Sequence, residues 1–126
     1  MDLTLQKPGD HLFVRSVSEQ GIRVGDTWHV DALILSAEHI DPAWDIRTFA
    51  QLDTTRLQAI FALAPDLVLL GTGAYQHFLP AELQIEFYRR GIGVEAMATQ
   101  AACRTFNVLV SEGRRVVAAL LPPNAC

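Results

Sequence analysis

The sequence has little of what marks a disulfide-rich, metal-binding or nucleic-acid-binding protein. It contains two cysteines, Cys103 and Cys126, no Cys-x-x-Cys motif, and no pair of histidines at the spacing of helical metal ligands. We therefore expect neither a disulfide framework nor a metal site. Basic residues are few, ten Lys and Arg against fourteen Asp and Glu, which gives a net charge of −4. They never exceed two in a row, so nucleic acid is not an expected partner.

Long hydrophobic runs are also absent. No apolar segment approaches the roughly 20 residues that cross a bilayer, because prolines interrupt the densest ones. Residues 1–10 show neither a basic region followed by an apolar run nor an Arg-rich pattern, so no signal or transit peptide is legible. Two cysteines without a partner motif suit a reducing compartment. Together these absences predict a cytoplasmic protein without a transmembrane segment.

The composition that is present favours one globular domain. The chain has 126 residues, of which 50% are hydrophobic and 19% charged, and its mean hydropathy is +0.20. A chain of this length can bury a core without disulfides or metals. Within a single domain over 1–126 we expect an N-terminal hairpin region at 10–36, an α/β part at 53–121, and a flexible tail at 122–126.

Local patterns predict the elements of that domain. Gly25-Asp26 is a hairpin turn between strand patterns, and Asp53 is a good N-cap for a helix whose apolar residues recur as far as Ala64. "DLVLLGTG" has apolar residues without alternation, which is typical of a strand buried on both faces. Strands are predicted at 12–14, 22–24, 27–30, 33–35, 67–70, 94–97 and 116–121, and helices at 54–64, 80–90 and 99–112. This order predicts an α/β fold in three layers, with a mixed sheet covered by helices.

The first candidate site is Gly71-Thr72-Gly73, which follows the buried strand directly. Glycines allow close backbone approach, and ligands often sit at the carboxyl ends of strands in open α/β sheets. If the strands expected at 67–70 and 94–97 lie side by side, Thr99 at the start of the next helix faces the same edge of the sheet and could help to bind a small anion. A tight strand-to-helix connection explains the glycines equally simply, and it is the more common case.

The second candidate is the helix for which Thr99 is the expected N-cap. At 100° per residue, Cys103 falls at the edge of its apolar face, while Arg104 and Asn107 fall on the opposite side. Cys103 is interpreted as a buried packing residue. The alternative, a reactive thiol in the first turn, needs a base, for which His77 is the best candidate. Glu95 ends the preceding strand, and an ion pair with Arg104 would clamp the turn between them.

These stretches carry a family resemblance. "LLGTG", "FLP" at 78–80, "RRGIGVEAMAT" at 89–99 and "AACRTFNVL" at 101–109 resemble the signature of a family of small α/β proteins known as a domain of unknown function. The family includes a mitochondrial respiratory complex I assembly factor and an adipogenesis-associated protein. The resemblance implies three layers around a mixed sheet of about five strands with one antiparallel member. It implies no catalytic activity and no cofactor, and its motif covers Gly71, Gly73, Glu95, Thr99, Cys103, Arg104 and Asn107 without assigned roles.

Two functional hypotheses follow. The first is a non-enzymatic interaction or assembly module with a protein partner, which the resemblance favours and which fits the lack of a recognisable catalytic set. The second is a small-molecule or anion-binding protein, conceivably an enzyme, that uses Gly71, Thr72 and Gly73 with Thr99, Arg104 and Asn107. A filled crevice beside an exposed apolar patch would favour the first. The choice between monomer and homodimer stays open.

Overall fold

The computed structural model describes residues 11–126. Residues 1–10, where no targeting segment is legible, and Asp10 at the start of the expected hairpin region lie outside the described residues. The elements are β1 (Val14–Ser18), β2 (Gly21–Val24), β3 (Thr27–His29), β4 (Leu33–Leu35), β5 (Ile40–Asp41), η1 (Phe49–Gln51), α1 (Thr54–Phe61), β6 (Leu67–Gly71), α2 (Ala81–Arg89), β7 (Gly93–Met97), α3 (Thr99–Ser111) and β8 (Val116–Leu120).

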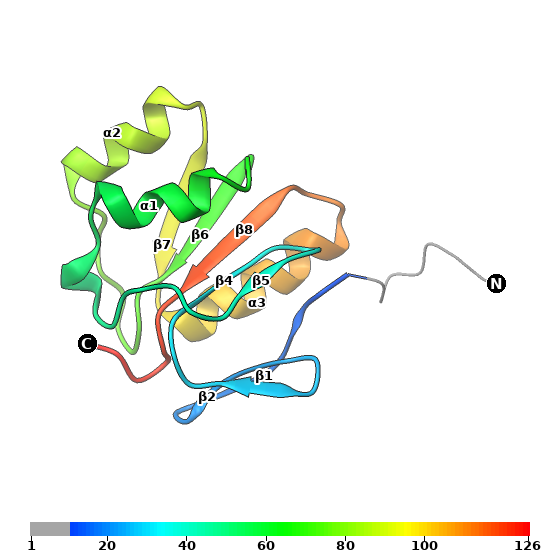
Figure 1. Ribbon diagram of the computed structural model, residues 1–126. Helices are drawn as coiled ribbons and strands as arrows, with labels where there is room; N and C mark the ends of the chain where they lie inside the picture. The colour runs from blue at the N-terminus through cyan, green and yellow to red at the C-terminus, as the bar shows by residue number, and fades with distance from the viewer. Residues whose placement is uncertain (1–10) are drawn as a thin grey trace.

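A five-stranded mixed sheet forms the centre of the molecule (Figure 1), with the order β5-β4-β8-β6-β7. Strands β8, β6 and β7 are parallel, whereas β4 pairs antiparallel with both β5 and β8. Only β4 therefore runs against the other strands of this sheet. The predicted α/β class and the mixed sheet with one antiparallel member are confirmed.

The N-terminal strands form a second, smaller sheet. Strands β1, β2 and β3 are antiparallel, and β2 and β3 pair from Val24 with Thr27 to Ile22 with His29 across the turn at Gly25 and Asp26. Gly25 has φ +58°, the left-handed conformation that a two-residue hairpin turn requires. The predicted hairpin is thus confirmed.

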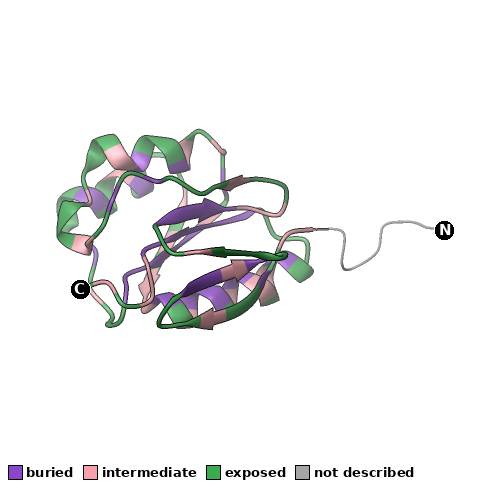
Figure 2. Ribbon diagram, turned by 60° about the horizontal axis from the view of Figure 1, so that its bottom comes forward, coloured by how far each residue is buried: buried purple, intermediate pink, exposed green. Residues whose placement is uncertain are grey.

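The central sheet is covered on both faces, which makes the three layers. Helices α1 and α2 pack on one face through Leu57, Ile60, Leu83 and Phe87. Helix α3 and the small sheet share the other face, where Phe106 and Val110 meet side chains of β1 and β2. The strands between the two layers are the most buried part of the chain (Figure 2), and all five residues of β8 are buried. This explains why "LVLLG" and "VVAAL" lack alternation.

Helix boundaries follow local chemistry with one correction. The Asp53 carboxylate accepts a hydrogen bond from the Arg56 N–H at 2.9 Å, as expected of an N-cap. The helix ends at Phe61 rather than reaching Ala64, because Ala64 is left-handed at φ +50° and Pro65 follows. Among residues 11–126, no helix is both long and apolar enough to cross a membrane.

Candidate functional site

The structure brings Gly71, Thr72, Gly73 and Thr99 together at the carboxyl end of β6. Strands β6 and β7 are adjacent and parallel, so the loops that follow them meet at one edge of the sheet. The N–H of Thr99 donates to the Gly73 carbonyl at 2.9 Å, and the N–H of Thr72 donates to the Met97 carbonyl at 2.8 Å. The predicted neighbourhood is therefore formed, and its backbone groups are bonded to one another.

The Thr99 hydroxyl joins three segments of the chain. It accepts a hydrogen bond from the Gly73 N–H and donates one to the Leu121 carbonyl, both at 2.9 Å, and its residue is fully buried. Thr99 was expected to be the N-cap of α3, but it is the first helical residue. Ala98 holds the cap position, without a side-chain bond. The hydroxyl does not cap the helix, because it bonds Gly73 in the loop after β6 and Leu121, the residue that follows β8.

The two glycines are explained by close contacts within the chain. A Cβ on Gly71 would lie 2.9 Å from the Thr99 Oγ1 and 2.8 Å from a methyl carbon of Leu120. Gly73 has φ +100°, and its Cβ would lie 2.4 Å from the carbonyl oxygen of Ala125. These contacts require glycine at both positions. They support the interpretation of Gly-Thr-Gly as a tight connection, while its use in ligand binding stays a prediction.

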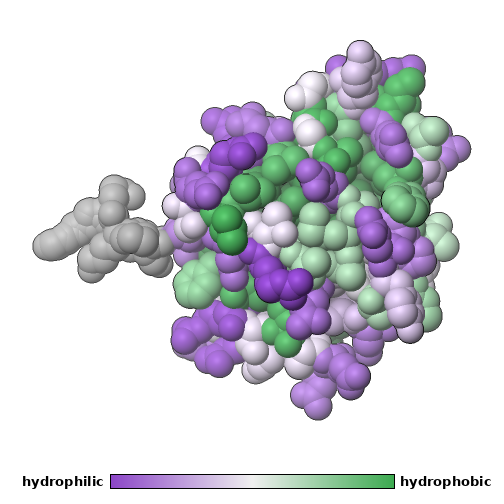
Figure 3. Space-filling model, turned by 180° about the vertical axis from the view of Figure 1, so that it is seen from behind, coloured by the Kyte–Doolittle hydropathy of each residue, from purple (hydrophilic) through white to green (hydrophobic). Residues whose placement is uncertain are grey.

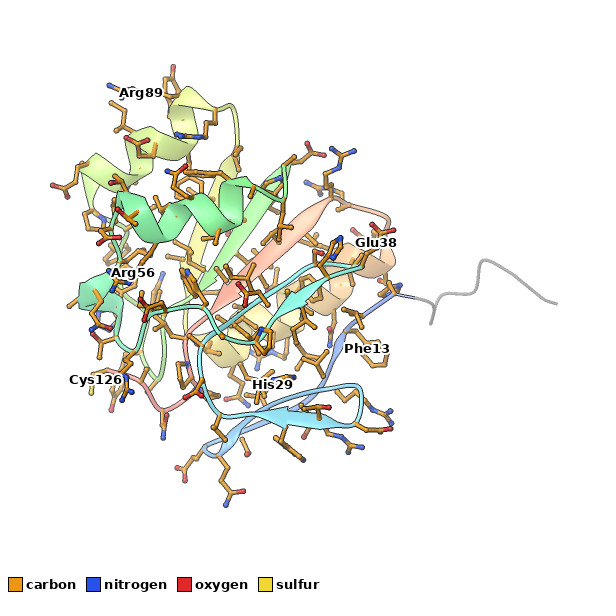
Figure 4. All side chains as sticks on the ribbon, viewed as in Figure 1. Phe13, His29, Glu38, Arg56, Arg89 and Cys126 are labelled. Carbon is orange, nitrogen blue, oxygen red and sulfur yellow. The ribbon has the colours of Figure 1, made fainter. Side chains whose placement is uncertain are left out.

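The C-terminal residues lie against this connection. The Ala125 carbonyl accepts the Ala74 N–H at 2.9 Å, and the Cys126 carbonyl accepts the Phe49 N–H at 3.4 Å. Figure 4 shows Cys126 beside the segment that carries η1. Residues 122–126, expected to form a flexible tail, thus have bonds to the body of the domain, and their motion in solution stays a prediction.

A hollow of about 320 Å³ remains beside this junction. Gly73 and Ala98 lie on one side of it with Gln100, and Glu19 contributes the charged group of its lining. Its lining includes no Lys or Arg. A carboxylate without a basic residue disfavours an anion here. The Thr72 hydroxyl is not free to bind a ligand either, because it donates to the Tyr75 carbonyl at 2.6 Å and its residue is fully buried.

Cys103 has the environment of a packing residue. Its relative exposure is 1%, and it belongs to the core cluster between α3 and the sheet. Desolvation by burial raises the pKa of the Cys103 thiol to about 12, although the nearby Arg104 charge acts in the opposite direction. His77 does not supply the missing base. Its ring stacks on Phe49, which packs in the cluster on the other face of the sheet.

Arg104 and Asn107 lie in different environments. The Asn107 amide accepts the Val14 N–H and donates to the Val14 carbonyl, both at 2.8 Å, so it fixes β1 against α3. It was expected to point outward, which is wrong because the small sheet covers that side of the helix. Arg104 is exposed and lines a hollow of about 220 Å³ that includes Arg15.

The expected clamp between Glu95 and Arg104 is not formed. In the described part of the chain no ion pair within 4.0 Å joins them. Glu95 lies on the same face of β7 as Met97, whose sulfur is 3.6 Å from the Thr105 hydroxyl. Arg104 is on another side of α3, facing Arg15 and Ser16. The two residues are close in sequence, but they belong to different surfaces.

A surface that sequence reasoning missed lies between α2 and β7. Phe78 and Tyr88 are each 84% exposed, and between them is a hollow of about 370 Å³. Its other lining residues are Leu79, Gln84, Phe87, Ile92, Val94 and Ala96. We call this the Phe78–Tyr88 surface. Viewed from behind, hydrophobic side chains are interspersed with hydrophilic ones on the molecular surface (Figure 3). A signal was present: Leu83 and Phe87 already supply the buried stripe of α2, which leaves Tyr88 outside it.

Comparison with known proteins gives the family. The family model described as protein of unknown function (DUF498/DUF598) matches residues 14–121. The chain is 40% identical over 84 residues to NADH dehydrogenase [ubiquinone] 1 alpha subcomplex assembly factor 3 from Danio rerio, an alignment that covers 65% of this chain and 48% of that protein. It is 53% identical over 68 residues to an uncharacterized protein from Rhodobacter capsulatus, covering 52% of this chain and 55% of the relative. The chain thus matches about half the length of both relatives.

Further similarities extend over more of the relative. A 13 kDa major membrane protein from Francisella tularensis subsp. holarctica is 35% identical, with 75% of this chain and 76% of that protein covered. The crystal structure of a protein from Bordetella parapertussis superimposes with a TM-score of 0.84 at 38% identity, covering 89% of this chain and 96% of that one. The solution structure of a Mth938-like domain from Bordetella pertussis gives a TM-score of 0.83 at 31% identity, covering 99% and 94%. The chain therefore belongs to the DUF498/DUF598 family.

Proposed function

We propose that the protein is a non-enzymatic interaction module, similar in role to the assembly factors among its relatives, and that it binds a protein partner through the Phe78–Tyr88 surface. The observation that carries this proposal is the exposure of both aromatic rings beside an apolar hollow. Aromatic side chains around a pocket are the usual anchors of protein interfaces. A contiguous exposed apolar patch is a common mark of a protein interaction site.

The chemistry elsewhere supports a non-enzymatic role. The thiol of Cys103 is buried and its pKa is raised. His77 stacks on Phe49, on the face of the sheet opposite to Cys103. The motif residues Gly71, Gly73 and Thr99 hold the strand ends together. A relative named as an assembly factor for NADH dehydrogenase makes a large protein partner a reasonable expectation. The compartment stays a prediction, because sequence analysis favours the cytoplasm while one relative is named a membrane protein.

The test is affinity capture from the source cell with three baits: the unchanged protein, the double variant Phe78→Ser with Tyr88→Ser, and the control Trp28→Ser. Trp28 is an aromatic on β3 that is 47% exposed. We expect a protein that the unchanged bait and the control retain, and that the double variant loses at least about tenfold. The double variant should unfold at the same urea concentration as the unchanged protein, because Phe78 and Tyr88 are largely exposed. Absence of any enriched protein, or equal capture by all three baits, would overturn the proposal.

A second candidate comes from the Arg104 hollow. Arg15 and Arg104 line it together with Ser16 and Gln100, and the Arg15 guanidinium lies 3.9 Å from the Asp26 carboxylate. Arginine pairs bind phosphate or carboxylate groups well. We propose that a small anion can bind there. Arg104 would then have the anion-binding role that the second hypothesis of the sequence analysis gave it. Titration with inorganic phosphate should shift the Ser16 resonance in the unchanged protein but not in Arg104→Gln. No shift below about 10 mM would exclude a site of useful affinity.

A further inference from the structure

Strand β7 is an open edge of the central sheet. Among the strands of residues 11–126, β6 is the one that pairs with it. The Gly93 N–H donates to Asp66 and the Met97 carbonyl accepts from Thr72, so the backbone groups at both ends of β7 face β6. Backbone groups alternate sides along a strand. Those of Val94 and Ala96 therefore point away from the sheet, where a further strand could pair with them.

One of these outward groups is occupied and the others are available. The Gln76 side chain donates to the Ala96 carbonyl at 3.1 Å. The Val94 N–H, the Val94 carbonyl and the Ala96 N–H form no hydrogen bond with any other described residue. The opposite edge, β5, has two residues, and short edge strands are one way in which proteins prevent pairing. With five residues, β7 lacks that protection.

The two faces of β7 specify what an added strand would carry. Val94 and Ala96 line the hollow of the Phe78–Tyr88 surface, so residues paired beside them would place their side chains toward it. Glu95 points to the α3 face, is exposed, and has no ion pair within 4.0 Å among the described residues. A basic side chain beside Glu95 would be attracted to it. The matching segment is thus apolar at two positions with Lys or Arg between them.

A second copy of β7 fits less well. Antiparallel pairing about Glu95 would place Val94 opposite Ala96 of the copy, but it would also place the two Glu95 carboxylates directly opposite each other. Like charges at such a position are destabilising. In this register the edge carboxylate discourages self-pairing and still admits a basic strand.

We propose that β7 accepts an extended segment of a protein partner as a sixth strand, and that this segment has the pattern apolar–basic–apolar. The inference rests on the proposed function, since the apolar side chains of the segment enter the Phe78–Tyr88 surface. Main-chain hydrogen bonds to Val94 and Ala96 give the segment its direction, and Glu95 selects its charge. Strand addition of this kind is a recurring mode of peptide recognition.

The probe is a capped nine-residue peptide of alternating valine and lysine, compared with a peptide of valine and glutamate. A third peptide repeats the valine–lysine sequence with alternate amides N-methylated, so that it cannot pair along one side. We expect the valine–lysine peptide to bind at least about fivefold more tightly than either control. Its binding should slow hydrogen exchange at the Val94 and Ala96 amides. Exchange at the Val17 amide, in the small sheet, should be unchanged.

Two variants of the protein complete the test. Glu95→Lys should weaken binding of the valine–lysine peptide about fivefold or more and strengthen binding of the valine–glutamate peptide. Glu38→Lys makes the same charge change in the exposed loop between β4 and β5, at the far edge of the sheet, and should alter both affinities by less than about twofold. The peptide comparison does not depend on any variant, so a folding defect in Glu95→Lys would leave the test intact.

Three results would overturn the inference. In the first, the valine–lysine and valine–glutamate peptides bind equally. In the second, the Phe78→Ser with Tyr88→Ser variant loses binding while Val94 and Ala96 exchange as before and Glu95→Lys binds normally; the proposed function would then stand without strand addition. In the third, the Val94 and Ala96 amides are protected without peptide and lose that protection on dilution, which would identify a second copy as the occupant. Failure of the proposed function alone would leave the peptide results unchanged and show no captured partner.

Discussion

Replacing Thr99 by valine should destabilise the domain strongly although the two side chains have nearly the same shape. The substitution leaves the Gly73 N–H and the Leu121 carbonyl without the hydroxyl that each bonds at 2.9 Å. Both residues are buried, so water cannot replace it. A buried polar group left unpaired costs about 1–3 kcal/mol, and two such groups give a loss of about 2–6 kcal/mol in the free energy of unfolding. That is a large fraction of the 5–15 kcal/mol typical of a domain.

The control is Thr105→Val in the same helix. The Thr105 hydroxyl donates to the Ala101 carbonyl at 3.0 Å, within the same helix, where a bond of this kind adds little. We expect its loss to stay below about 1 kcal/mol. Thr99→Ser, which keeps the hydroxyl and removes only a methyl group, should recover most of the stability lost in Thr99→Val. Urea unfolding followed by circular dichroism and by tryptophan fluorescence measures all three. Equal stability of Thr99→Val and Thr105→Val would refute the assignment of Thr99 as the junction.

The remaining predictions concern the glycines and the cysteines. Gly73→Ala should cost more than about 2 kcal/mol, because it adds a Cβ 2.4 Å from the Ala125 carbonyl at a positive φ. Gly25 also has a positive φ, but a Cβ added there would have no atom within 4 Å, so Gly25→Ala should cost about 1 kcal/mol. Equal urea midpoints of the two variants would contradict the close contact of Gly73 with Ala125. Cys103 should react slowly with a thiol reagent at pH 7.5 and Cys126 quickly; fast labelling of Cys103 would restore the thiol hypothesis. The pKa of the Cys103 thiol is about 12 in the folded state against 9.0 for an unperturbed cysteine, so its contribution to stability is present below pH 9 and is lost as the pH rises toward 12. Between pH 8 and 10.5 the unchanged protein should lose about 2 kcal/mol more than Cys103→Ala, and identical pH profiles would contradict this.

Much of the fold could be predicted because its signals are local. The apolar run of β6, the Asp53 cap and the hairpin turn at Gly25 each act over a few residues. Most predicted elements therefore agree with the observed ones within a few residues at their ends. The exceptions are β1, which shares only Val14 with the strand predicted at 12–14, and β5, which was not predicted. The single antiparallel member was implied by the family resemblance, and β4 fills that place.

The site was less predictable because its decisive contacts join distant parts of the chain. Asn107 bonds Val14 across 93 positions, and Thr99 bonds Leu121 across 22. Helical geometry alone places Asn107 opposite Phe106, but it does not say that a second sheet covers that side of α3. In the same way, proximity in sequence suggested an ion pair of Glu95 with Arg104 that their different faces prevent. Burial of Cys103 was predictable, since small apolar neighbours surround it on one helical face.

The roles of the motif residues limit what family membership says about function. Gly71 and Gly73 admit close backbone contacts, Thr99 joins the ends of two strands, and Asn107 attaches the small sheet. Each of these roles concerns the fold, so a chain can match the motif without sharing a partner with other members. Information about partners should lie instead in side chains that the fold leaves uncovered.

In this chain those side chains surround β7. Phe78 and Tyr88 frame an apolar hollow on one face of the strand, and Glu95 places a carboxylate on the other. None of the three is needed to hold the domain together by the contacts described above. A relative that keeps Gly71, Gly73 and Thr99 but carries polar residues at Phe78 and Tyr88, or a basic one at Glu95, should therefore fold in the same way and bind a different segment. If the proposed strand addition is correct, the β7 edge selects the partner, and the motif determines only the domain that presents this edge.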